Sequence, residues 1–462
     1  MTIELRPYQT DLIAAAREKL TQHKSVLVQA ATGAGKTALA SYMVKGAIQK
    51  NKPVFFTVHR KDLIKQTSVA FNEFEIPHSF IAANKPYNPY SMAQICSIDT
   101  FKNRLGKVPV PALMIVDECH MANSEGWSKV INYYRQQGTY IIGLSATPWR
   151  LDGSGLGKHF ESMVTGPAMS WLIENRYLSD YRLFAPSIPD LDGVKITAGD
   201  FNRGDLADWA DGDNVRMGCA IEHYKKLAPN TRAICYCVSR RDSEKTAHAF
   251  REAGIPAMHM DGETPMEERK KIISAYANGQ ISVITNVDLI TTGFDLAAQV
   301  GRDVAVETII LMRPTRSMSL YLQMVGRGLR PKPNPCIILD HSGCAYEHGL
   351  PDDKRVWTLD DRPRRKAGEK TISIKVCQEC LRAYRAHAKK CPYCGHVPVV
   401  KYREIETVDG DLIEVAREMN KKRDKQAVGR ARTIEELTQI AHERGYKIGW
   451  VWQQARLKGI RS

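Results

Sequence analysis

The stretch Ala30-Ala-Thr-Gly-Ala-Gly-Lys-Thr37 lies between two apolar segments of different character. Ser25–Gln29 before it is short and rich in β-forming residues, and Leu39–Ile48 after it has the length of a helix. Gly33 and Gly35 permit a loop whose backbone N–H groups curl around a phosphate, and the N-terminus of the next helix adds a positive dipole. The stretch predicts a strand, a phosphate-binding loop and a helix in that order, which is the start of an α/β fold.

Two polar side chains of this loop have the chemistry of nucleotide binding. Lys36 is long enough to reach the β- and γ-phosphates, and the Thr37 hydroxyl can ligate Mg²⁺. Ala30 stands where the common form of the motif has glycine, and a short motif also arises by chance. A degenerate loop that binds nothing is the alternative at this point.

The surrounding sequence repeats the order of strand, polar loop and helix. Apolar runs with few charges are typical of strands that are buried on both faces of a parallel sheet. The pattern restarts near residue 232, which predicts a second α/β domain. The expected strands are Ser25–Gln29, Val54–His59, Ile95–Ile98, Leu113–Val116 and Tyr140–Leu144, then Arg232–Val238, Ser282–Val287, Thr308–Met312 and Cys336–Leu339.

Length and composition exclude several classes of protein. A chain of 462 residues predicts about two to four domains. With 43% hydrophobic and 25% charged residues it is neither wholly disordered nor a collagen-like or disulfide scaffold. No apolar run approaches the ~18 residues of a membrane span, and the first residues lack the apolar region of a signal peptide. We therefore expect a cytoplasmic protein with no membrane partner.

The charge balance points to a polyanionic partner. Lys and Arg number 66 against 51 Asp and Glu, which gives a net charge of +15. Residues 361–462 hold 24 basic and 13 acidic residues, so most of the excess lies in the C-terminal part. Nucleic acid is one such partner, but ordinary basic proteins also exist, and charge alone does not decide between them.

A second chemical motif, Asp117-Glu-Cys-His120, directly follows the expected strand Leu113–Val116. At the carboxyl end of a strand, Asp117 can hold the water shell of a metal ion. Glu118 can orient and deprotonate the attacking water, because phosphoryl transfer needs positioning and charge neutralisation. An acidic pair at a solvated strand end is the alternative.

A third motif lies in the second domain. Gln323, Arg327 and Arg330 are spaced i, i+4, i+7, so a helix would present all three on one face. The planar guanidinium groups suit a γ-phosphate, provided that the two domains close on each other. The alternative is a solvated basic helix.

With these motifs in order, the chain resembles the superfamily 2 helicases of the DExH type, and among them the RadD-like bacterial and phage-encoded group. The resemblance covers about residues 5–340. The motifs are Leu5-Arg-Pro-Tyr-Gln9 (Q), Ala31–Thr37 (I), Thr57-Val-His-Arg60 with Gln66 (Ia), Ser97-Ile-Asp-Thr100 (Ib), Asp117–His120 (II), Ser145-Ala-Thr147 (III), Cys237-Val-Ser-Arg240 (IV), Thr291-Thr-Gly-Phe-Asp295 (V) and Gln323–Arg330 (VI). Two positions depart from the family pattern: Ala30 replaces a common glycine, and Thr292 stands where many relatives have Glu.

The resemblance implies two tandem RecA-like domains with parallel sheets, ATP in the cleft between them and a nucleic-acid strand across both. It implies catalytic roles for Glu118, Lys36, Asp117, Arg327, Arg330 and Gln323, with Mg²⁺ on Thr37 and Asp117. Nucleotide contacts are expected from Arg6, Gln9, Thr32, Gly33, Ala34, Gly35, Lys36, Thr37, Gly293 and Asp295. Strand contacts are expected from His59, Arg60, Ser97, Thr100, Ser239, Arg240 and Thr291, and coupling of hydrolysis to strand binding from His120, Ser145 and Thr147.

Four of the 11 cysteines form two CxxC pairs, Cys377/Cys380 and Cys391/Cys394, separated by ten residues. This spacing is typical of a zinc ribbon or a treble clef, and four thiolates suit a structural tetrahedral Zn²⁺. A redox pair of dithiols is the alternative. The basic residues in and near the loop between the pairs either bind phosphate or offset the negative charge of the cluster, and charge alone does not separate these roles. They are Arg382, Arg385, Lys389 and Lys390.

The expected organisation has six parts. They are a RecA-like domain at 1–165, a connector at 166–214, a second RecA-like domain at 215–351, a charged exposed linker at 352–371, a zinc ribbon at 372–400 and a basic helical tail at 401–462. In the tail, Thr433-Ile-Glu-Glu436 predicts a capping box that starts a helix, and Gly445 predicts its end. Tyr446, Trp450 and Trp452 either stack on bases or form the core of a helical hairpin.

These expectations combine into an ATP- and Mg²⁺-dependent nucleic-acid helicase or translocase, with DNA favoured over RNA on resemblance alone. We expect a monomeric motor, with the zinc ribbon or the tail available to a protein partner. Two alternatives stay open. One is a duplex translocase or annealing motor that separates no strands, and the other is a zinc-dependent nucleic-acid-binding platform with a vestigial ATPase.

Overall fold

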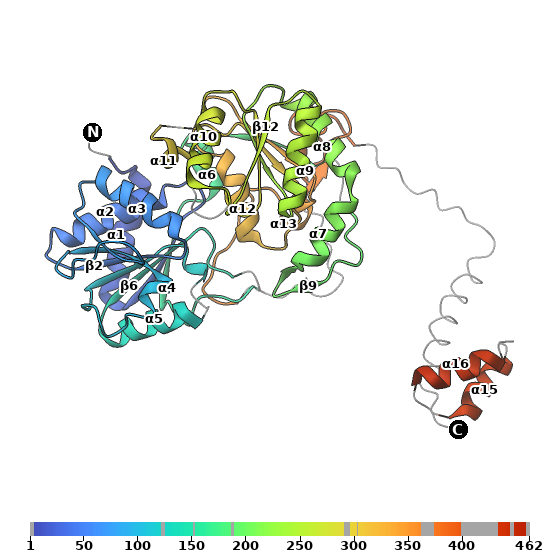
Figure 1. The fold of residues 1–462 in the computed structure, drawn as a ribbon, viewed down its shortest axis with the longest axis horizontal. Coiled ribbons are helices and arrows are strands. Elements are labelled where there is room, and N and C mark those ends of the chain that lie inside the picture. Colours follow the sequence, from blue (N-terminus) through green and yellow to red (C-terminus); the bar gives the residue numbers. More distant parts are fainter. Residues whose placement is uncertain are drawn as a thin grey trace. The chain divides into compact units, whose positions relative to one another are not determined.

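The computed structural model describes residues 4–121, 125–150, 153–185, 189–290, 296–302, 304–361, 374–398, 433–443 and 448–458. The chain divides into two compact units, residues 1–398 and residues 399–462. The first unit holds two α/β lobes and a four-cysteine module (Figure 1). Among the described residues, no helix combines the length and the apolar character that crossing a bilayer requires.

The first lobe is a seven-stranded parallel sheet in the order β3-β4-β2-β5-β6-β1-β7. Its strands are β1 (Ser25–Gln29), β2 (Val54–Val58), β3 (Ser79–Ile81), β4 (Ala93–Ser97), β5 (Leu113–Val116), β6 (Tyr140–Ser145) and β7 (Ser162–Thr165). Its helices are α1 (Pro7–Gln22), α2 (Lys36–Ile48), α3 (Lys61–Glu73), α4 (Ile98–Phe101) and α5 (Glu125–Gln136), with a 3₁₀ turn η1 (Cys119–Met121). Helices α1 to α3 cover one face of the sheet, and α4 and α5 cover the other (Figure 1). Both faces of the central strands are buried as a result, in agreement with their apolar sequences.

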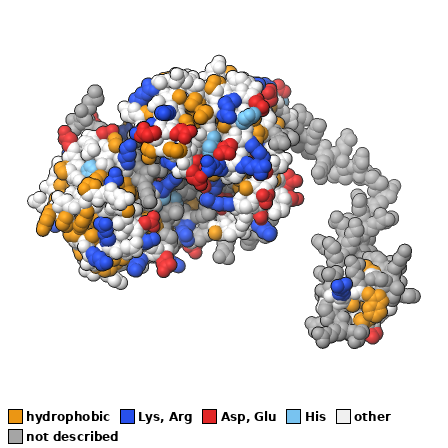
Figure 2. Space-filling model, in the orientation of Figure 1, with side chains coloured by type: hydrophobic (Ala, Val, Ile, Leu, Met, Phe, Trp, Pro, Cys, Tyr) orange, Lys and Arg blue, Asp and Glu red, His pale blue; other side chains and the backbone are white. Residues whose placement is uncertain are grey.

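The second lobe is a six-stranded parallel sheet in the order β12-β13-β11-β14-β15-β8. Its strands are β8 (Tyr181–Phe184), β11 (Ala233–Tyr236), β12 (Ala257–Met260), β13 (Val283–Asn286), β14 (Thr308–Leu311) and β15 (Cys336–Asp340). Its helices are α8 (Asn214–Leu227), α9 (Arg240–Glu252), α10 (Met266–Ala277), α11 (Leu296–Val300), α12 (Met318–Gly328) and α13 (Cys344–His348). The prediction of two tandem domains with parallel sheets is confirmed. Figure 2 shows acidic and basic side chains interspersed over this lobe. Arg240 and Glu244 of α9 form one ion pair between such groups.

The segment 166–214, expected to be a connector, also contains part of the second sheet. After α6 (Met169–Glu174) the chain enters β8, which pairs with β15 at the sheet edge. A short hairpin of β9 (Ile196–Thr197) and β10 (Asp200–Phe201) and helix α7 (Arg203–Gly212) follow. The carboxylate of Asp200 accepts hydrogen bonds from the Thr315 hydroxyl and from the Arg316 N–H, so the hairpin is held on the second lobe.

The segment 352–371, expected to be an exposed linker, is partly packed on the first lobe. Trp357 contacts Trp149, and Leu359 packs against the apolar cluster under α4 and α5. Residues 362–371 lie outside the described residues.

The C-terminal unit contains a helical hairpin of α15 (Ile434–Glu443) and α16 (Ile448–Lys458). The predicted capping box is present: the Thr433 N–H donates to the Glu436 carboxylate, and the Glu436 N–H donates to the Thr433 hydroxyl. Trp450 packs against the hairpin core, whereas Trp452 is 54% exposed. The expected helix end at Gly445 and the side chain of Tyr446 lie outside the described residues.

Candidate active site between the two lobes

The phosphate-binding loop connects β1 to α2, as the sequence predicts. Gly33 and Gly35 have φ of 85° and 78°, the left-handed region in which glycine is free of strain. A Cβ on Gly35 would lie 2.6 Å from the Gln9 amide nitrogen, so the loop also needs glycine for space. The first turn of α2 begins at Lys36, which places its side chain and that of Thr37 at the cavity described below.

Residues of the Q motif bind the backbone of this loop through hydrogen bonds. The Gln9 amide nitrogen and the Tyr8 hydroxyl each donate to the Ala34 carbonyl at 2.9 Å, and Gln9 is 4% exposed. The Gln9 carbonyl oxygen accepts from the Arg6 N–H, and the Arg6 guanidinium donates to the Tyr177 carbonyl. Both ends of the Gln9 amide are therefore engaged with protein, whereas the resemblance implies that this side chain reads adenine.

The acidic pair follows β5. The Glu118 carboxylate lies 3.8 Å from the Lys36 ammonium and 3.3 Å from the His120 imidazole. Burial, and secondly the charge of Glu118, raises the pKa of Asp117 to about 7. Burial favours the neutral form of Glu118 as well, but Lys36 and His120 outweigh it and lower the pKa of this carboxyl well below its usual range. The geometry therefore keeps Glu118 ionised, as a base must be.

A series of polar side-chain contacts connects the acidic pair to the end of β6. His120 Nδ1 lies 3.2 Å from the hydroxyl of Ser145, and that hydroxyl donates to the Thr147 carbonyl at 2.6 Å. His59 adjoins the same group, and burial lowers its pKa to about 4 although the charge of Glu118 opposes this. The expected coupling residues thus form a connected set with Glu118.

The second lobe completes the cavity. Helix α12 lies so close to the phosphate-binding loop that a Cβ on Gly326 would be 2.4 Å from the Thr32 methyl group. One cavity of about 780 Å³ is lined by residues of both lobes. Those of the predicted site are Thr32, Gly33, Gly35, Lys36, Thr37, Asp117, Glu118, Gln323, Arg327 and Arg330. Glu118 of the first lobe and Arg327 and Arg330 of the second, which lie more than 200 residues apart in the sequence, therefore line the same cavity.

Two residues near this cavity were not predicted. Leu178 packs where a Cβ on Gly33 would be, at 2.8 Å, and Ser179 bonds to the chain directly after α12 through the Arg330 carbonyl and the Lys332 N–H. They link the phosphate-binding loop to α12. No motif marks them, because their contribution is packing and backbone bonding within a weakly periodic segment.

The expected nucleic-acid residues are only partly brought together. Ser97 and Thr100 line a second cavity, of about 940 Å³, with Lys85, Arg104 and Lys107. This combination of hydroxyl and basic groups suits a phosphate backbone.

Three other residues expected to contact nucleic acid, Arg60, Ser239 and Arg240, make bonds within the protein. The Arg60 guanidinium donates to the Asp288 carbonyl across the lobes. Ser239 caps α9, and Arg240 pairs with Glu244, Asp261 and Glu263. Thr291 lies outside the described residues, as do Gly293 and Asp295, from which nucleotide contacts are expected.

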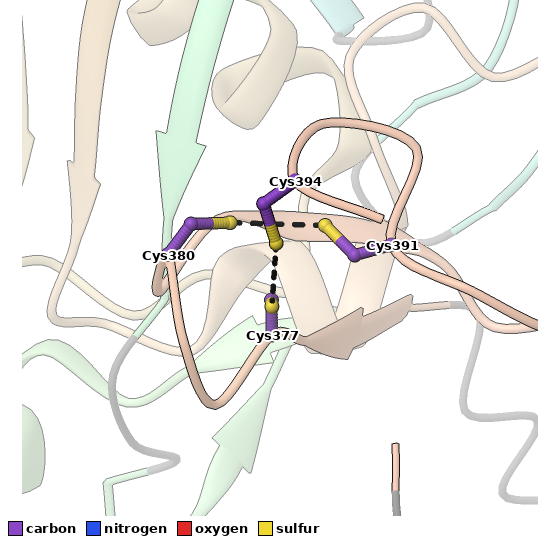
Figure 3. A group of neighbouring side chains, drawn as sticks. All are labelled: Cys377, Cys380, Cys391 and Cys394. Carbon is purple, nitrogen blue, oxygen red and sulfur yellow. Dashed lines mark hydrogen bonds between the residues drawn. The ribbon is translucent and has the colours of Figure 1, made fainter. Parts of the chain in front are cut away.

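The four cysteines of the CxxC pairs converge (Figure 3). Their sulfur atoms all lie within 4.8 Å of one another, with 3.5 Å between those of Cys377 and Cys394 and 3.7 Å between those of Cys380 and Cys391. Sulfur atoms about 2.3 Å from a tetrahedral Zn²⁺ are separated by about 3.8 Å, so the cluster has the size of a zinc site. Disulfide bonds are excluded by these distances.

The two CxxC turns have the same backbone geometry. The N–H groups of Leu381 and Gly395 donate to the carbonyls of Cys377 and Cys391, and both donors have positive φ. The module packs on the second lobe through a bridge between Arg382 and Phe184 of β8. Arg385 pairs with Asp352 and Asp353 at 3.0 Å, which adds to this contact.

Fold and site together define a class of protein with two parallel α/β lobes around a phosphate-binding loop. The family model of the res subunit of type III restriction enzymes matches residues 2–150, and the helicase conserved C-terminal domain matches residues 216–332. A 51.5 kDa protein of a Lactococcus phage is 33% identical over 374 residues, which cover 80% of this chain and 77% of that protein. A Saccharomyces cerevisiae protein named as an ATP-dependent helicase, IRC3, is 26% identical, and the match covers 74% of this chain and 52% of that protein.

Solved structures show the same fold. A fragment described as an HsdR subunit of a type I restriction enzyme from Vibrio vulnificus superposes with a TM-score of 0.57 at 20% identity, covering 74% of this chain and 65% of that chain. The type ISP restriction-modification enzyme LlaBIII, solved bound to DNA, has a TM-score of 0.54 at 14% identity over 73% of this chain and 28% of its own. The chain belongs to the superfamily 2 helicases, a family of ATP-dependent enzymes.

Proposed function

We propose that this chain is an ATP-driven motor that moves along or remodels DNA. The proposal rests on one observation: Lys36 and Glu118 of the first lobe line the same cavity as Arg327 and Arg330 of the second. A triphosphate in this cavity would contact both lobes, so its hydrolysis would change how the lobes are held together. Such coupling is what a motor requires.

In this proposal each side chain has one task in the reaction. Lys36 neutralises the β- and γ-phosphate oxygens, and Glu118 accepts a proton from the water that attacks the γ-phosphorus. The bond to the β-phosphate oxygen breaks, which gives ADP and phosphate, while Arg327 and Arg330 stabilise the charge on the transferring group. Thr37 and Asp117 line one side of the cavity, and their oxygen atoms suit Mg²⁺, which would neutralise phosphate charge.

Two finer assignments belong to the same proposal. DNA is favoured over RNA because the first lobe matches the family model of a restriction-enzyme subunit. The four-cysteine cluster would hold one structural Zn²⁺, which is supported by the spacing of its sulfur atoms and by the two matching turns.

The test is ATP turnover by the full chain at one stated salt concentration, with single-stranded DNA, duplex DNA, forked DNA or RNA. We expect DNA to stimulate turnover at least tenfold. The absence of stimulation by any nucleic acid would contradict the motor and favour a binding platform. Unwinding of a labelled fork, compared with displacement of a triplex strand, then separates a helicase from a duplex translocase.

A further inference from the structure

After the second lobe, the chain returns to the first lobe within a few residues. Arg355 fixes it at the start: its guanidinium donates to the carbonyls of His348, Leu350, Pro351 and Asp353 at 2.8 to 3.2 Å. Val356 follows with 79% of its surface exposed. We call the next five residues, Trp357–Asp361, the interlobe strap.

The interlobe strap is bound to the loop that follows motif III. The Trp149 indole N–H donates to the Asp360 carbonyl at 3.1 Å, and its ring lies 5.0 Å from that of Trp357. The Gly157 N–H donates to the Leu359 carbonyl at 3.0 Å, and the Gly155 N–H donates to the Asp361 carboxylate at 2.8 Å.

The contact is also close sterically. A Cβ on Gly155 would lie 2.0 Å from the Leu359 carbonyl oxygen and 2.4 Å from the Asp360 carbonyl carbon, both of which are backbone atoms. The strap backbone therefore packs directly against Gly155 of the first lobe and leaves no room for a side chain there.

The link between the two anchors is short. Arg355 and Trp357 are separated by one residue, so their Cα atoms are at most about 7 Å apart in an extended chain. The lobes are also joined by the connector, which is bonded to β1 at Gly166 and to the end of α12 at Ser179. Two bodies that are joined at two points can rotate about the line through those points, but they cannot separate or turn freely.

We propose that the interlobe strap is a second attachment between the lobes. Together with the connector it restricts the motion of the lobes to a hinge rotation, and this rotation aligns α12 with the phosphate-binding loop. Its residues are positioning residues, because they lie outside the cavity that contains Lys36 and Arg327. The inference goes beyond the proposed function, since it concerns how the lobes move and not what they hydrolyse.

A graded set of substitutions in the full chain tests this role. Gly155→Ala places a methyl group against the strap backbone, while Gly157→Ala brings one to 3.3 Å of the Leu359 oxygen, a milder conflict. Gly212→Ala is the matched control, because a Cβ there has nothing within 4 Å and the glycine has no positive φ. Hydrogen exchange of the peptide that contains Gly155 and Gly157 reports whether the strap is released.

Two measurements report its function. One is the distance distribution between labels carried by non-natural residues at Tyr90 and Glu222, which are exposed positions on the first and second lobes. The other is kcat for ATP hydrolysis, compared with the dissociation constant of ATP. We expect Gly155→Ala to broaden the distribution and lower kcat at least fivefold with ATP affinity within twofold of wild type. Gly157→Ala should fall between it and the control, and Trp357→Phe should retain function that Trp357→Ala loses.

Three results would overturn the inference. Unchanged exchange in Gly155→Ala would show that the strap does not occupy this site. A released strap with unchanged distances and unchanged kcat would show that it only stabilises the fold. A lower ATP affinity that accounts for all of the loss would also contradict a hinge. If wild type shows no nucleic-acid-stimulated turnover, the proposed function fails, but the distance distribution still decides the role of the strap.

Discussion

The backbone of Glu118 has φ of 47°, in the left-handed region where a non-glycine residue is strained by about 1–3 kcal/mol. Its N–H donates to the Asp117 carboxylate at 3.0 Å, which favours this conformation. The turn directs the Glu118 side chain to Lys36 and His120 at the end of β5. This turn places a buried carboxylate beside a lysine, in agreement with the base that we propose at this position.

Glu118→Gln should lower ATP turnover at least 100-fold, because the amide has the size of the carboxyl group but cannot accept the proton of the attacking water. ATP binding should be retained, since Lys36 and the loop glycines are unchanged. Steady-state hydrolysis and equilibrium binding of an ATP analogue measure the two effects. Glu73→Gln is the control, because it removes another carboxylate that lines the same cavity. Turnover that persists in a clean Glu118→Gln preparation would remove the assignment.

At the scale of elements, the sequence predicts the central strands of both sheets and misses their edges. Within the two large sheets, the four strands without a prediction are β3, β7, β8 and β12, the first and last strand of each sheet. A central strand is buried on both faces and is therefore a continuous apolar run, as in β11 and β14. Edge strands are short or carry exposed residues such as Arg182 and Met258, so no periodicity marks them.

The candidate site divides in the same way. Lys36, Glu118 and Arg327 belong to motifs, because their chemistry demands particular side chains at fixed spacing. Leu178 and Trp357 act through packing, which many apolar residues could supply, so only the structure reveals them. Arg240 and Arg60 stay predicted nucleic-acid contacts, and the structure adds that both arginines bind protein groups.

Helix α12 must approach the phosphate-binding loop without a side chain at Gly326. Gly326→Ala places a Cβ 2.4 Å from the Thr32 methyl group, so the helix or the loop must shift. Because a displacement of about 1 Å can cost ~10²-fold in rate, we expect kcat to fall 10- to 100-fold. Gly218→Ala in α8 is the control, since a Cβ there meets nothing within 4 Å. Equal kcat in the two variants would show that α12 does not need this close approach.

We expect the four-cysteine module to depend on a bound metal, because its own core is small. Its buried cluster consists of Cys377, Tyr384 and Cys391, with Cys380 and Ala388 packed beside them. Removal of Zn²⁺ should therefore unfold residues 374–398. Cys380→Ser should reduce zinc from about one to below about 0.2 per chain and make this segment sensitive to protease, while exposed Cys219→Ser should change neither. Zinc content by mass spectrometry and limited proteolysis measure both effects, and a segment that stays protected without metal would contradict a structural site.

At the scale of the whole molecule, the basic excess lies mainly before the helical tail. Residues 361–398 contain 10 basic and 3 acidic residues, whereas residues 399–462 contain 14 and 10. Within the first group, Arg385 is paired with two aspartates, and Arg382 lies over the ring of Tyr393. Lys389 and Lys390 are exposed neighbours in the loop between the CxxC pairs, and Lys375 is exposed as well, so these three lysines can meet phosphate.

Replacement of both Lys389 and Lys390 by alanine should weaken DNA binding and reduce the slope of log K against log salt by about 2, because each phosphate contact releases about one counterion. The pair Lys225→Ala with Lys226→Ala, exposed on α8, has the same charge change and should leave the slope unchanged. A chain that ends at Pro398 keeps the module and the strap, so it should retain most of the slope. Anisotropy of labelled DNA from 50 to 300 mM salt measures all three. If the slope falls when residues 399–462 are removed and not when Lys389 and Lys390 are replaced, the helical tail is the phosphate contact. The two lysines would then offset the negative charge of the thiolates.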